Sequence, residues 1–87
     1  MPGKGGRGIR ISINVEKKTI STKLLEFLPK EEFDDFRQIH TSLGFRFSRK
    51  TKSNYIVYDK EDFEQFAEEY IKLMKNRFKD KVRIEKR

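Results

Sequence analysis

The sequence predicts an α+β domain in which two helices cover one face of a four-stranded, mainly antiparallel sheet, in the order ββαββα. Three observations favour this class. Apolar and polar residues alternate over residues 9–16, as in a half-buried strand. The segments 29–43 and 59–80 repeat apolar residues at helical spacing. Short aromatic segments at 45–48 and 55–58 lie between the two helices, where a second strand pair is expected.

The first two expected strands form a hairpin near the start of the chain. Ile9, Ile11 and Ile13 alternate with polar residues, so this strand has one buried face and one solvated face. Lys17 and its neighbour offer a turn, and residues 19–23 return as the second strand.

The first helix is expected from about Pro29 to Leu43. Proline suits the first turn of a helix, because its missing N–H has no partner there in any case. Gly44 is a good terminator, since glycine readily adopts the left-handed conformation that closes a helix. The aromatic strand follows at once. Phe45 and Phe47 alternate with polar residues, so we expect both on the same face, with the core favoured.

The second helix is expected to begin after Asp59, which is a strong N-cap residue, and to end near Asp80. An apolar stripe that includes Phe63 and Phe66 gives this helix a buried face. Val82 in the tail is compatible with either a short extra strand or a frayed end.

The chain of 87 residues is long enough for one domain. We expect a flexible basic, glycine-rich arm at 1–8, a single domain at 9–80 and a basic tail at 81–87. With no cysteine, neither a disulfide nor a thiolate metal site supports the small core. Dense aromatic packing, or a homodimer or higher homo-oligomer, is expected to compensate.

The charge is unevenly distributed along the chain. The sequence holds 21 Lys and Arg against 14 Asp and Glu, a net charge of +7. The excess lies at 1–23, 44–58 and the tail, while both expected helices are mildly acidic. In a two-layer domain this pattern places the positive field on the sheet face away from the helices, which favours a nucleic acid as partner. The competing interpretation is that the charges only keep a small domain soluble.

The candidate binding residues are basic and aromatic residues of the arm, strands and turn. Phosphate contacts are expected from Arg7, Arg10, Arg46, Arg49, Lys50 and Lys52, and base stacking from Phe47, Tyr55 and Tyr58. Tyr55 and Tyr58 point to opposite faces of their strand, so at least one is expected to be accessible.

Signals for catalysis are weak. His40 has no second histidine or cysteine for a metal site and is expected to be a solvated helix residue. The paired acidic residues lie on helix surfaces at i,i+1 spacing, which does not converge on one site. We therefore expect no enzyme, no metal and no cofactor. Without a secretory or membrane-spanning segment, we expect a soluble, cytoplasmic protein with no membrane partner.

Two resemblances concern residues 9–75. The runs Leu-Pro-Lys-Glu-Glu-Phe-Asp-Asp-Phe and Leu-Gly-Phe-Arg-Phe-Ser-Arg-Lys-Thr-Lys-Ser-Asn-Tyr resemble the ThermoDBP-related single-stranded-DNA-binding proteins of hyperthermophilic archaea. That resemblance implies sequence-tolerant binding of single strands in a cleft with apolar walls and basic rims, and assembly into oligomers. The same run is similar to small accessory DNA-binding domains of superfamily 2 helicases, which usually have Trp where this chain has Tyr55.

The sequence thus predicts sequence-tolerant binding of single-stranded DNA through a basic, aromatic-bearing sheet face. One alternative is an accessory module that binds RNA or duplex DNA. Another is a dimeric protein-interaction module, which would associate through the apolar stripe of the second helix.

Overall fold

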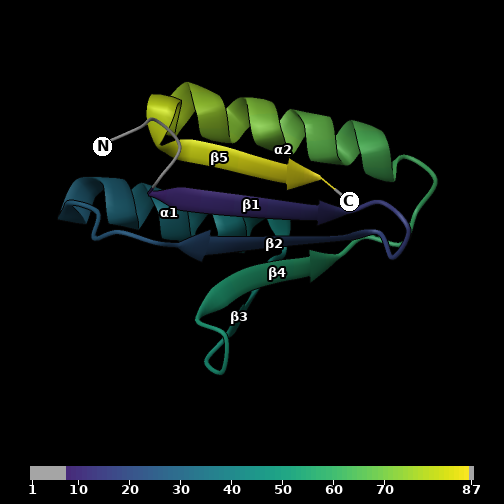
Figure 1. Cartoon of the computed structure of the whole chain (residues 1–87), viewed down its shortest axis with the longest axis horizontal. Coiled ribbons are helices and arrows are strands. Elements are labelled where there is room, and N and C mark those ends of the chain that lie inside the picture. The colour runs from purple at the N-terminus through teal and green to yellow at the C-terminus, as the bar shows by residue number, and fades with distance from the viewer. Residues whose placement is uncertain (1–7, 87) are drawn as a thin grey trace.

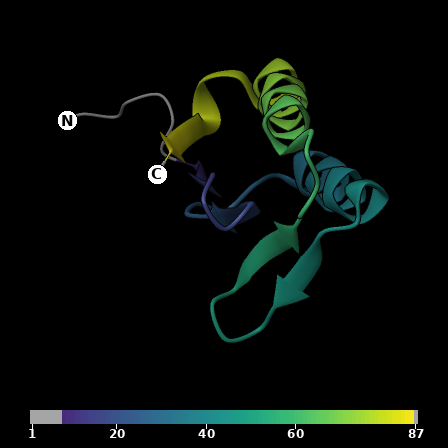
Figure 2. The same cartoon turned by 90° about the vertical axis from the view of Figure 1, so that its right-hand side faces the viewer.

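The computed structural model, which describes residues 8–86, is a five-stranded sheet with two helices on one side (Figure 1). In chain order the elements are β1 Ile9–Asn14, β2 Thr19–Leu24, α1 Lys30–Leu43, β3 Arg46–Ser48, β4 Ser53–Val57, α2 Phe63–Phe78, a 3₁₀ turn Lys79–Lys81 and β5 Val82–Lys86. Viewed from its end, the molecule shows both helices on the same side of the sheet, with the β3–β4 hairpin projecting from its body (Figure 2).

The α+β class and the two helices on one face are confirmed, but the expected sheet of four strands is wrong in detail. The strand order is β3-β4-β2-β1-β5, and β5 pairs parallel to β1, so the sheet is mixed. The tail therefore forms the fifth strand. Val82 lies beside Ile9 and Ile84 beside Ile11, which extends the apolar face of β1 under α2. Burial of these apolar side chains stabilises the tail as a strand, whereas the sequence of the tail alone was equally compatible with a frayed end.

The core lies between the sheet and the two helices. It is built from the alternate residues of β1, from Ile20 of β2 and from the buried stripe of α2. Its fully buried large side chains include Phe36, Phe63 and Tyr70, so aromatic packing supplies much of its volume. Ion pairs join α1 to the C-terminal part of the chain: Arg77 binds Asp35, and Lys81 Nζ lies 2.6 Å from Glu32 Oε1.

The ends of α1 are as predicted to within one residue. The helix begins at Lys30 and is closed by Gly44, whose φ of 91° is the left-handed conformation expected of a terminating glycine. The start of α2 is three residues later than predicted. The Lys60 N–H bonds the Tyr58 carbonyl in a turn, so the helix begins at Phe63 rather than after Asp59.

The expectation that Phe45 and Phe47 share one environment is wrong. Phe45 is buried, whereas Phe47 is 59% exposed. Phe45 precedes β3, and its N–H bonds the His40 carbonyl at the end of α1. The helix terminus, rather than strand alternation, therefore directs the Phe45 ring into the core, 4.9 Å from the ring of Tyr70 between centroids.

The expectation of a solvated His40 is also wrong. The side chain is 1% exposed and belongs to a buried chain of hydrogen bonds. Its Nδ1–H donates to the Phe36 carbonyl at 2.6 Å, and its Nε2 accepts from the Tyr70 hydroxyl at 2.5 Å. That hydroxyl accepts in turn from Thr22 Oγ1 at 2.5 Å. Burial lowers the pKa of His40, so the neutral imidazole that this arrangement requires is favoured.

Candidate nucleic-acid interface

The sheet face away from the helices, here called the open face, carries the side chains that alternate with the core residues. The strand register places Arg10 beside Lys23 on one neighbouring strand and beside Arg83 on the other. In the same way, Tyr55 lies beside Ser21 of β2 and Arg46 of β3. Five strands therefore contribute to one face, which is mostly polar and basic and also carries the exposed Val57 of β4.

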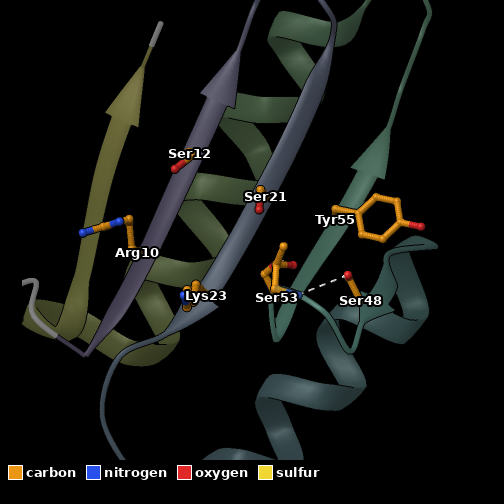
Figure 3. Close-up of a pocket in the computed structure, with 8 residues that line it drawn as sticks. Arg10, Ser12, Ser21, Lys23, Ser48, Ser53 and Tyr55 are labelled. Carbon is orange, nitrogen blue, oxygen red and sulfur yellow. Dashed lines mark hydrogen bonds between the residues drawn. The ribbon is translucent and has the colours of Figure 1, made fainter.

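A shallow hollow of about 460 Å³ lies on this face. It is lined by Arg10, Ser12, Ser21, Lys23, Ser48, Thr51, Ser53 and Tyr55, seven of which Figure 3 labels. The Tyr55 ring is the aromatic surface of the hollow, and 38% of the residue is exposed. Five of the other lining residues are serines or a threonine, whose small side chains leave space for a flat group beside that ring.

The rim of the hollow is shaped by the turn between β3 and β4. Thr51 Oγ1 lies 2.6 Å from Ser53 Oγ, and the Thr51 N–H bonds Ser48 Oγ at 3.5 Å. Figure 3 shows Ser48 and Ser53 at this end of the hollow. Arg49 and Lys50 are exposed in this turn, at the tip of the hairpin. The turn therefore brings two further cations to the end of the open face.

The charge on the open face is strongly positive. Four exposed cations, Arg10, Lys23, Arg46 and Arg83, project from its strands. Among the described strand residues, Glu85 is the one acid on this face, with its Oε2 3.7 Å from Arg10 Nε. On the helix side, by contrast, acids and cations occur together, and some of them are paired, as in Arg77 with Asp35. The open face thus carries an excess of positive charge.

The structure brings some of the predicted site residues together and separates others. Arg10, Arg46 and Tyr55 lie on the open face, and Arg49 and Lys50 lie at the hairpin tip. Arg7 lies outside the described residues.

Phe47 and Lys52 lie on the other side of the hairpin, in a second hollow that we call the aromatic groove. It has a volume of about 420 Å³ and is lined by Leu24, Phe33, Phe36, Arg37, Thr41, Phe45, Phe47, Lys52 and Asn54. Apolar side chains form most of its walls, and two cations, Arg37 and Lys52, stand among them.

Tyr58 lies against α2. Its ring stacks on that of Phe66, with centroids 4.1 Å apart and planes within 2°, and its hydroxyl donates to Asp62 Oδ2 at 3.1 Å. Burial and the neighbouring carboxylates, chiefly that of Asp62, raise the pKa of Tyr58. Lys60 Nζ is 5.3 Å from the centre of the same ring. The ring and the hydroxyl of Tyr58 therefore both make contacts within the domain.

Two residues of the open face, Lys23 and Arg83, were not among the predicted contacts. The alternation of residues 19–23 contained the signal for Lys23, because Lys23 shares the face of Ser21 once the strand pairs with β1. Arg83 had no such signal, since its place beside Arg10 depends on the tail being a strand.

Comparisons with family models, with curated proteins and with solved structures find no match. Within residues 8–86, no helix has the length and apolar character required to cross a membrane. The same part of the chain holds no group of three or more His, Asp or Glu side chains placed to bind a metal ion.

Proposed function

We propose that this protein binds single-stranded DNA on the open face of its sheet, with little dependence on base sequence. The observation that carries the proposal is the combination of an accessible Tyr55 ring with the four cations of that face in one continuous surface. Cations that follow phosphates and aromatic rings that stack on bases are the two elements by which proteins hold single strands.

The placement of Tyr55 favours a single strand over a duplex. Bases in a duplex are stacked on one another, so an aromatic side chain reaches their faces only where a strand is open. The serine hydroxyls around the ring are small and are not arranged as the bidentate pairs that read a particular base. Backbone contacts and stacking therefore supply the affinity, which makes binding sequence-tolerant.

The first test is fluorescence anisotropy of labelled oligo-dT at a series of salt concentrations, with duplex DNA and oligo-U as competitors. If about four phosphates are neutralised, log K against log salt should have a slope of about −3. Displacement by duplex at equal length would replace the proposal with duplex binding, and stronger competition by oligo-U would make RNA the ligand. A flat salt response would contradict the electrostatic part.

Single substitutions with a matched control test whether the open face is the surface that binds DNA. Tyr55→Ala should cost about 1–3 kcal/mol of binding free energy. Lys23→Gln should weaken binding and flatten the salt slope by about 0.7. The control is Lys72→Gln, which removes the same charge from the exposed side of α2 and should leave both quantities unchanged. Equal losses from Lys23→Gln and Lys72→Gln would show that net charge alone, not the open face, accounts for binding.

A further inference from the structure

The loop between β2 and α1 presents an unusually exposed aromatic residue. Phe27 is 93% exposed and Leu25, two residues before it, is 44% exposed. The loop is held at both ends, because the Leu25 N–H bonds the Gly8 carbonyl at 2.8 Å and Leu28 is buried. A phenylalanine held out in water in this way leaves its full apolar surface without a partner. We call this projection the Phe27 knob.

The aromatic groove has the complementary shape and chemistry. Its base is formed by the buried rings of Phe36 and Phe45, while Phe33 and Phe47 stand half-exposed in its walls. Side chains of this kind bind another aromatic ring favourably, in edge or offset contacts. The groove is thus a receptor for a single protruding ring, and it lies on the same chain as the knob.

The charges around knob and groove are opposite. Glu26 precedes Phe27 and Glu31 lies in the first turn of α1, while Lys30 between them is paired with Asp34. Within residues 8–86, unpaired carboxylates therefore flank the knob. Arg37 and Lys52 stand at the groove. Neither of these two cations forms an ion pair within the described part of the chain. Complementary charges of this kind orient two surfaces and favour their association.

We propose that the Phe27 knob of one copy of this chain inserts into the aromatic groove of a second copy. The contact is reciprocal about a two-fold axis, so each copy both donates and receives a ring. A reciprocal contact fills both knobs and both grooves within a closed dimer, whereas a head-to-tail contact leaves a free knob and a free groove unless it closes into a ring.

The acidic flanks of the knob distinguish this partner from nucleic acid. A phosphate backbone would be attracted to Arg37 and Lys52 but repelled by Glu26 and Glu31, whereas a second copy satisfies both pairs of charges. The aromatic groove lies on the side of the β3–β4 hairpin away from the open face, so a ring bound in the groove leaves the hollow of the open face accessible. The inference does not depend on the proposed DNA binding, because self-association is measured without DNA.

The size of the contact sets the expected strength. One buried phenylalanine accounts for about 150–250 Å², while a standard interface buries about 800 Å² on each partner. The reciprocal contact buries two phenylalanine rings, with Leu25 and Phe33 around them, which is less than a standard interface. We therefore expect a dimer that dissociates when the protein is diluted.

Sedimentation equilibrium of the full chain over a range of concentrations, without DNA, is the direct test. The wild-type protein should form a dimer, and Phe27→Ala should raise its dissociation constant by about 100-fold or more, because two aromatic anchors are lost at once. Leu73→Ala, which truncates an exposed leucine of α2, is the control and should leave the constant unchanged. Circular dichroism melting should show all variants folded, since Phe27 is almost fully exposed.

A mixing experiment tests the complementarity. Phe47→Glu places a negative charge in the groove and should also prevent self-association. A mixture of Phe27→Ala and Phe47→Glu should associate again, because an intact knob then meets an intact groove once in each pair.

Three results would overturn the inference: a monomeric wild-type protein at all concentrations, a Phe27→Ala protein that still dimerises, or no association in the mixture. Loss of oligo-dT binding by Phe47→Glu with no change in sedimentation would assign the groove to nucleic acid instead. Loss of association by Leu73→Ala rather than by Phe27→Ala would place the interface on α2.

Discussion

On β2, the side chains of Ser21 and Lys23 lie on the open face, whereas Thr22 between them points into the core. All three are polar, but their surroundings differ. Thr22 is fully buried and donates to the Tyr70 hydroxyl, while the other two line the hollow of the open face among cations. The difference shows that a polar residue stabilises the fold where its hydrogen bonds are complete, and is available to a ligand where they are not.

The largest expected effect on stability comes from placing a positive charge on the core side of β2, compared with the same charge on its open face. Thr22→Lys should cost about 4 kcal/mol or more and unfold the domain, because the ammonium would be buried without a counterion. Ser21→Lys should change stability by no more than about 0.5 kcal/mol and steepen the salt slope of oligo-dT binding by about 0.7. Urea denaturation and anisotropy titration measure these two quantities. Comparable destabilisation by both changes would mean that the faces do not differ as described.

Tyr70→Phe tests the buried hydrogen bonds alone. Removal of the hydroxyl leaves His40 Nε2 without a donor and Thr22 Oγ1 without its acceptor, so the free energy of unfolding should fall by about 1–3 kcal/mol. Oligo-dT affinity measured well below the melting temperature should be unchanged, because no atom of the open face is altered. A loss of affinity in a fully folded variant would show that the two faces are coupled.

The pH dependence of stability should reflect His40. Its pKa is lowered in the folded protein, chiefly by burial, so below a pH of about 6.5 the unfolded chain takes up a proton that the folded protein refuses. Stability should therefore be fully present above this pH and should fall by up to about 2 kcal/mol on acidification to pH 5. His40→Gln, though less stable, should lose this part of the slope. An unchanged slope would assign the dependence to other groups.

The smallest effect is expected at the single acidic residue on the strands of the open face. Glu85→Gln removes the partner of Arg10 and should alter stability by less than about 1 kcal/mol, as is usual for an exposed ion pair. It should raise oligo-dT affinity up to about fivefold, because Arg10 is then free for a phosphate. Weaker binding by this variant would show that Glu85 positions Arg10 for its ligand.

Much of the fold was predictable because its signals are local. The alternation of Ile9, Ile11 and Ile13 specifies a half-buried strand. Gly44 specifies the end of α1, because glycine readily adopts the left-handed conformation that closes a helix. The segregation of charge between strands and helices was also visible, since it depends only on which residues belong to which element.

The candidate site was predictable only in part. Arg10, Arg46 and Tyr55 were identified from composition and alternation, but the sequence did not show that they share a face with Lys23 and Arg83. That grouping depends on the register of strands that are far apart in the chain, and a shift by one residue would invert every side chain.

The sequence by itself determined the helices, the first hairpin and the excess of positive charge outside the helices, because periodicity, capping and composition act over a few neighbouring residues. Tertiary structure alone decided that the tail is a strand beside β1 and that His40 is buried against Tyr70. In both cases the deciding partner is distant in the chain, and burial against it outweighs the preference of the local segment. The different burial of Phe45 and Phe47 depends on the end of α1, which binds the Phe45 N–H, and on the Tyr70 ring against which Phe45 packs.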